Sequence, residues 1–172
     1  MAILFLNACV SPPTYPPKPK IEFVSITKSN VIPSDTFSII FSFQDGDGDL
    51  GFENRDTAFC DLCESIESPT SCYNNETFSI FLKDSRTNCL TTYNLPFVPP
   101  NGSTNAISGR ITVVAGGGGL CCLPPSGFPC CDINSGCDIA TDSIIYSIQI
   151  RDRLGNYSNE VQTIPVVVKC RN

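Results

Sequence analysis

Thr36-Phe-Ser-Ile-Ile-Phe-Ser-Phe43, followed directly by Gln44-Asp-Gly-Asp-Gly-Asp-Leu-Gly-Phe52, is the stretch of sequence that decides the fold. In its first half, Phe or Ile stands at every second position from 37 to 43, with Ser38 and Ser42 on the opposite face. This period of two predicts a β-strand with one buried face. In its second half, Asp45, Asp47 and Asp49 alternate with glycines, so three carboxylates are crowded into a turn at the end of that strand.

Three carboxylates this close repel one another unless a cation neutralises them, and Ca²⁺ is held by six to eight oxygens, mostly carboxylate and carbonyl. The alternation of Asp with Gly predicts a structural Ca²⁺ site at Asp45, Asp47 and Asp49. The alternative is a solvated acidic turn, since Asp and Gly are common turn residues. The loop is not an EF-hand, because its sixth position is Leu50 and its twelfth is Asp56 where Gly and Glu are required.

Outward from this stretch, the chain reads as short strands separated by turn residues. The seven predicted strands are 21–27, 36–43, 77–83, 88–95, 107–115, 143–151 and 160–169. Pro165 in the last of them favours an edge position. This pattern predicts an all-β, Ig-like sandwich of about seven strands over residues 21–172. Two irregular inserts, 53–76 and 116–142, interrupt it. In that topology the acidic loop and the turn 152–156 share one pole, so Asp152 is predicted as a fourth ligand.

The composition excludes several function classes. Of 172 residues, 17 are Asp or Glu and 11 are Lys or Arg, which gives a net charge of −6 and disfavours nucleic-acid binding. The absence of His and Trp removes the usual general base and the commonest metal-binding side chain. We therefore expect a protein that is not an enzyme.

The N-terminal segment predicts a membrane anchor. Leu6-Asn-Ala-Cys9 resembles a bacterial lipobox, with residues 1–8 as a truncated signal peptide and Cys9 as the lipidated residue. Residues 10–20 hold five prolines, which favours a semi-rigid polyproline II tether.

Eleven cysteines point to an oxidising compartment. With Cys9 assigned to lipid, ten remain to form five disulfides, with Cys170 holding the C-terminal end. They are Cys60, Cys63, Cys72, Cys89, Cys121, Cys122, Cys130, Cys131, Cys137 and Cys170. Neighbours such as Cys121 and Cys122 are expected to bond different partners. A zinc site and a thiol oxidoreductase centred on Cys60-Asp-Leu-Cys63 are the alternatives.

Several of these motifs together resemble a group of small Bacteroidota outer-membrane lipoproteins. The lipobox, the Pro-rich tether and the acidic loop carry the resemblance, with Ile107-Ser-Gly-Arg-Ile-Thr-Val113 and Ile150-Arg-Asp-Arg-Leu-Gly-Asn-Tyr-Ser-Asn159. The resemblance implies an Ig-like protein that is anchored by lipid in the outer membrane and has an outer-membrane protein as partner. It does not determine whether the protein sits in the periplasmic or the surface-facing leaflet. The two cysteine-rich inserts are not associated with that group.

The resulting functional hypothesis is a non-catalytic, calcium-stabilised accessory subunit of an outer-membrane or cell-surface complex. The alternative is a surface adhesin or a glycan- or ligand-binding module that uses the two inserts. An enzyme, either a thiol oxidoreductase or a hydrolase using Asp47 and Asp49, is the third hypothesis.

Overall fold

The computed structural model describes residues 14–52, 78–100, 105–117, 120, 122–123 and 140–170. Every regular element in these ranges is a strand, which confirms the all-β class. The strands are β1 (Lys20–Ile26), β2 (Asn30–Val31), β3 (Thr36–Asp45), β4 (Ile80–Asp84), β5 (Leu90–Tyr93), β6 (Ile107–Gly116), β7 (Thr141–Ile144), β8 (Tyr146–Ile150), β9 (Val161–Gln162) and β10 (Val166–Lys169). No helix in the described part of the chain is long and apolar enough to cross a membrane.

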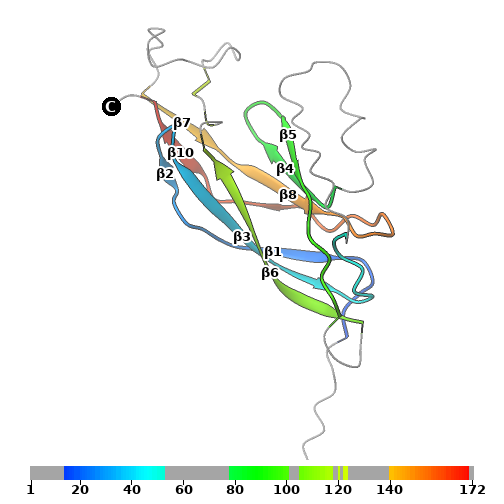
Figure 1. Cartoon of the computed structure of the whole chain (residues 1–172). Coiled ribbons are helices and arrows are strands. Elements are labelled where there is room, and N and C mark those ends of the chain that lie inside the picture. The colour runs from blue at the N-terminus through cyan, green and yellow to red at the C-terminus, as the bar shows by residue number, and fades with distance from the viewer. Residues whose placement is uncertain are drawn as a thin grey trace, which may run out of the picture.

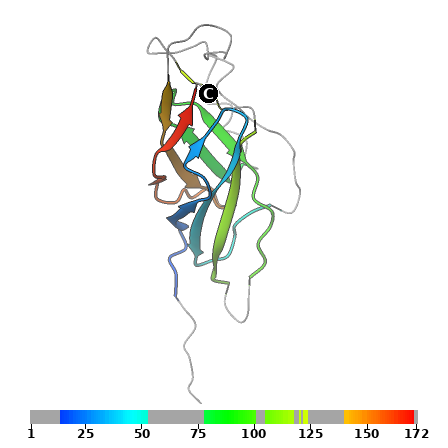
Figure 2. The same ribbon diagram turned by 90° about the vertical axis from the view of Figure 1, so that its left-hand side faces the viewer.

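The strands form three sheets, with the orders β1-β3-β6, β5-β4-β8-β9 and β2-β10-β7. All neighbouring strands are antiparallel except β2 and β10, which are parallel. Figures 1 and 2 show that the strands follow the long axis of an elongated body. The first described residues lie at one end of this axis and β10 ends at the other.

Strand β3 is the centre of the first sheet, as its alternating sequence predicts. Its alternate residues Phe37, Ile39, Phe41 and Phe43 are buried, whereas Ile40 on the other face is half-buried. The strand pairs with β6 from Thr36 opposite Gly116 to Asp45 opposite Ile107. The strand is two residues longer than the predicted range 36–43 because this ladder continues past the last Phe. Asp45, the first acidic residue of the loop, is therefore the last residue of β3 and belongs to the sheet.

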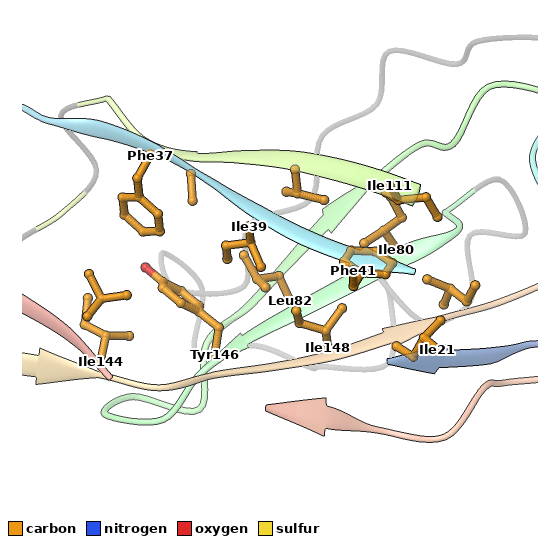
Figure 3. Close-up of a cluster of buried hydrophobic side chains, with 14 of the residues drawn as sticks. Ile21, Phe37, Ile39, Phe41, Ile80, Leu82, Ile111, Ile144, Tyr146 and Ile148 are labelled. Atoms are coloured by element: carbon orange, nitrogen blue, oxygen red, sulfur yellow. The ribbon is translucent and has the colours of Figure 1, made fainter. Parts of the chain in front are cut away.

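The buried face of β3 packs onto β4 and β8 of the second sheet. Phe37, Ile39 and Phe41 point at Leu82 and Tyr146 across the interior (Figure 3). The Phe37 and Tyr146 rings lie 6.2 Å apart between centroids. Burying the Phe41 side chain, which has no exposed surface, contributes on the order of 2–3 kcal/mol by transfer from water.

The two C-terminal predicted strands are each divided in the structure. The range 143–151 becomes β7 and β8, separated at Ile145, and 160–169 becomes β9 and β10, separated at residues 163–165. Pro165 lies in that break because it has no N–H for the ladder. The expectation of an edge strand is right for β9 but wrong for β10, which is the central strand of β2-β10-β7.

A disulfide closes the end of the molecule where β10 finishes. Cys122 is bonded to Cys170, 48 residues away. This confirms that Cys170 holds the C-terminal end and that Cys122 does not pair with its neighbour. Cys89 is also disulfide-bonded. The other cysteines and most of both predicted inserts lie outside the described residues.

Candidate metal centre

The acidic loop leaves β3 at Asp45 and folds back against the body. Gly48 and Gly51 both have a positive φ, 70° and 76°, which favours glycine at these two turns. After the loop, Leu50 is fully buried in the core, and the N–H of Phe52 donates to the carbonyl oxygen of Leu95 at 3.0 Å. The loop is therefore held at both of its ends, with the three Asp residues between them.

The three predicted ligands are brought together. One carboxylate oxygen each from Asp45, Asp47 and Asp49 lies within 4.8 Å of the others. The Oδ1 atoms of all three are buried and have no hydrogen-bond partner in the described part of the chain. The Oδ2 of Asp45 differs, because it accepts a hydrogen bond from the N–H of Asp49 at 3.0 Å.

This crowding changes how readily two of the carboxyls ionise. Burial, followed by repulsion from Asp47, raises the pKa of Asp45 to about 7. Burial, followed by repulsion from Asp152 and Asp47, raises the pKa of Asp49 to about 6. Without a cation, part of the cluster must therefore be protonated or remain under strong mutual repulsion.

The half-buried carboxylates Asp84 and Asp142, in contrast, have hydrogen-bond and ion-pair partners for both of their oxygen atoms. At the opposite end, Arg86 lies between Asp84 and Asp142, bonded to one at 2.7 Å and to the other at 2.6 Å. The second oxygen of Asp142 accepts from the N–H of Ser143, and both Asp84 oxygens accept from Arg86. Buried polar atoms normally have such partners, so the three unpartnered Oδ1 atoms in one place could hold a cation.

The turn after β8 meets the acidic loop, as predicted from the sandwich topology. The N–H groups of Arg153 and Leu154 donate to the carbonyl oxygen and the Oδ2 of Asp49, at 3.1 and 3.2 Å. Asp152 is almost fully buried, and its charge contributes to the raised pKa of Asp49. Its two carboxylate oxygens accept hydrogen bonds from the N–H and the side-chain amide of Asn156. Asp152 is thus close to the cluster while it also closes its own turn.

Sequence reasoning missed Arg153 as a part of this pole. Its guanidinium donates to the carbonyl oxygen of Gly51 at 2.9 Å and lies over the Phe97 ring, 4.9 Å from the centroid. No local pattern signals these contacts, since the three residues are far apart in the chain. The Asp-Arg-Leu-Gly-Asn turn indicated only that a turn was present.

The N-terminal segment also reaches this pole. The N–H of Gly46 donates to the carbonyl oxygen of Pro16 at 2.9 Å. A Cβ at residue 46 would lie 2.3 Å from the carbonyl oxygen of Tyr15, so only glycine permits this approach. The end of the predicted tether and the acidic loop are therefore in direct contact.

This arrangement is suited to bind a hard cation through oxygen atoms. The donor set holds no nitrogen or sulfur, and it concentrates three negative charges, which together suit Ca²⁺ or Mg²⁺ rather than a softer metal. The identity of the ion as Ca²⁺ stays a prediction. Cys9, Cys60 and Cys63, on which the lipid and thiol hypotheses depend, lie outside the described residues. Comparison with protein-family models, curated proteins and solved structures gave no match.

Proposed function

We propose that this protein is a non-catalytic interaction module, anchored to the bacterial outer membrane by lipid on Cys9, whose N-terminal pole is held rigid by Ca²⁺. In this proposal it serves as an accessory subunit of an outer-membrane or cell-surface complex. The single observation that supports a bound cation is that the Oδ1 atoms of Asp45, Asp47 and Asp49 are buried, close together and without hydrogen-bond partners in the described part of the chain.

The strand pairing supports an Ig-like sandwich as the scaffold of this module. One sheet has the order β1-β3-β6, and the β8 neighbours β4 and β9 lie in the sheet that faces it. The chain passes from β7 to β8 and from β9 to β10 with only short breaks, which supports treating the β2-β10-β7 and β5-β4-β8-β9 sheets as one layer opposite the β1-β3-β6 sheet. Sandwiches of this kind place their loops at the two ends, as the acidic loop is placed here.

The position of the cation site supports a mechanical role rather than a chemical one. A cation bound by the three carboxylates occupies their oxygen atoms, and carboxylates that are metal ligands are not free to act as general acid and base. It would instead join β3, the turn after β8 and the N-terminal segment at one point. The tether would then leave the body in a fixed direction.

The experiment that tests this function is isolation of the native protein from detergent-solubilised outer membrane, with intact-mass analysis of the same sample. The expected result is a stoichiometric membrane-protein partner and a mass that includes acyl chains on Cys9. A protein that elutes alone and carries no lipid would contradict the accessory-subunit proposal.

A second candidate function, a ligand-binding module, is favoured by a separate observation. The outer face of the β1-β3-β6 sheet carries a polar hollow of about 320 Å³. This volume is within the range of small-molecule sites, and the hollow lies on the sheet face rather than on the two inserts.

A further inference from the structure

The hollow on the outer face of β1, β3 and β6 consists of two rows of polar side chains. Strand register sets Lys20, Gln44 and Ser108 side by side in one row, and Glu22, Ser42 and Arg110 in the next. Gly109 and Phe43 lie between the rows and complete the lining. Adjacent strands are about 4.8 Å apart, so each row spans roughly 10 Å, which is the width of one or two sugar rings.

Between the two polar rows, the floor of the hollow is the strand backbone at Phe43 and Gly109. Phe43 is only 5% exposed, and a Cβ at residue 109 would lie 3.1 Å from its ring. Phe43 and Gly109 are register partners and follow the alternation of Phe41 and Asp45, so the Phe43 side chain and the Cβ position of residue 109 belong to the opposite face of the sheet and do not project between the two polar rows. This leaves the space between the rows open to a ligand whose rim of hydroxyl groups meets the polar side chains on both sides.

The charges of the lining are not balanced. Lys20 is paired with Glu22 at 3.1 Å, whereas Arg110 has no ion pair with any residue in the described part of the chain. This leaves one guanidinium on an exposed sheet face of a protein whose net charge is −6. A guanidinium is a fork of donors that matches a carboxylate in a bidentate geometry.

The neutral groups of the lining complement this charge. Gln44 is exposed and offers both an amide donor and an acceptor, and the Ser108 hydroxyl is 3.4 Å from the Tyr15 hydroxyl at the rim. The Ser42 hydroxyl donates to the carbonyl oxygen of Glu22 at 3.4 Å and can still accept. Groups that both donate and accept are those that sugar hydroxyls require.

We propose that this hollow binds an acidic sugar, with the carboxylate on Arg110 and the sugar hydroxyls on Gln44, Ser42 and Ser108. The proposal rests on the second candidate function, and it does not depend on the cation. Gln44 and Asp45 are neighbours on β3, but Gln44 points outward and Asp45 is fully buried. The two sites therefore lie on opposite faces of the same sheet.

The test is an amide NMR titration of the full chain with methyl β-glucuronide, against methyl β-glucoside as the neutral counterpart and inorganic phosphate as a plain anion. Shifts at Ser42, Ser108 and Gly109 with the glucuronide, and weaker binding of the glucoside, are expected. Arg110→Gln should weaken glucuronide binding about tenfold or more, because a charge-assisted contact is lost. Lys83→Gln, an exposed lysine on β4, is the matched control and should change nothing.

The other outcomes overturn the proposal in distinct ways. Equal binding of phosphate would show a general anion site, and equal binding of the glucoside would show that the carboxylate is not recognised. Binding that Arg110→Gln leaves unchanged would place the sugar elsewhere but keep the ligand-binding function. No binding of any probe would remove the support for the acidic-sugar site and for the ligand-binding function. Because Arg110 is exposed, we expect Arg110→Gln to have the same melting temperature as the native protein. That measurement shows whether a loss of binding in the variant comes from misfolding.

Discussion

The guanidinium of Arg153 donates a hydrogen bond to the carbonyl oxygen of Gly51 at 2.9 Å, and this contact attaches the turn after β8 to the end of the acidic loop. Arg153 also lies over the Phe97 ring, so one side chain connects three separate segments of the pole. Arg153 thus contacts the loop near its end, at Gly51, whereas the N-terminal segment contacts it at Gly46.

Replacing Arg153 with Ala should therefore loosen the pole. We expect the free energy of unfolding to fall by about 1–2 kcal/mol, from one charge-assisted hydrogen bond and one cation–π contact at an exposed site. Urea denaturation with a chelator present measures this directly. Arg110→Ala, on the outer face of β6 and without such contacts, is the control. An equal loss in both variants would mean that Arg153 has no special role.

Asp45→Asn should abolish stabilisation by calcium. The amide has nearly the shape of the carboxylate but lacks its charge, so the cation loses one of its three charged ligands, at the most buried position. For the native protein, calcium at about one hundred times its dissociation constant should add about 2.7 kcal/mol to the free energy of unfolding. Thermal unfolding with Ca²⁺ and with chelator gives the difference.

The control for Asp45→Asn is Glu160→Gln, because Glu160 is exposed and distant in sequence from the loop. It should keep the full response to calcium. A calcium response of the same size in Asp45→Asn would contradict the assignment of the site. Stabilisation by Mg²⁺ but not by Ca²⁺ would keep the site and change its ion.

The pH dependence of stability should reverse when the cation is added. In the cation-free protein, the pKa of Asp45 is raised to about 7 and that of Asp49 to about 6, from 3.8. The folded state therefore binds these protons more tightly than the unfolded state. This contribution is complete below pH 3.8 and is lost as the pH rises through about 6 and about 7.

With calcium bound, the same rise in pH should increase stability, because protons and the cation compete for the carboxylates. Urea midpoints measured across this window, with chelator and with calcium, give two curves of opposite slope. Parallel curves would show that these carboxyls do not bind the ion. Asp45→Asn should make both slopes shallower, with the contribution of Asp49 remaining in the curve with chelator.

Removal of the Cys122–Cys170 disulfide should destabilise the opposite end. The double variant Cys122→Ser with Cys170→Ser avoids a free thiol and should lose about 2–4 kcal/mol of the free energy of unfolding. Hydrogen exchange should become faster at Val166 and Val168, which precede the bridge on β10, and should stay unchanged at Ile39 on β3. A uniform increase across both strands would indicate global destabilisation without a local effect.

Sequence periodicity predicts much of this fold but not its long-range connections. Alternation of Phe and Ile identified β3, and alternation of Ile144, Tyr146 and Ile148 identified the β7–β8 range. The break at Ile145 was not visible, because these three side chains stay buried on both sides of it. What changes there is the partner strand, from β10 to β4 and β9, and pairing partners are not encoded in a local pattern.

In the candidate site, too, the features set by a local pattern were predictable and those set by long-range packing were not. Asp45, Asp47 and Asp49 were found because they share one short motif, and their convergence depends only on the local turn. The contact of that loop with the turn at Asp152 was expected from topology. The contacts of Arg153 and the approach of Pro16 to Gly46 depend on how distant segments pack, so the residues alone did not reveal them.

The parallel pairing of β2 with β10 has a consequence for stretching. The chain enters at one end of the long axis and β10 finishes at the other (Figure 2), and Asn30 and Val31 are paired with Val167 and Val168. A pulling force applied between the two ends would draw these strands past each other in opposite directions. Their hydrogen bonds would then share the load at the same moment instead of opening one after another like a zipper.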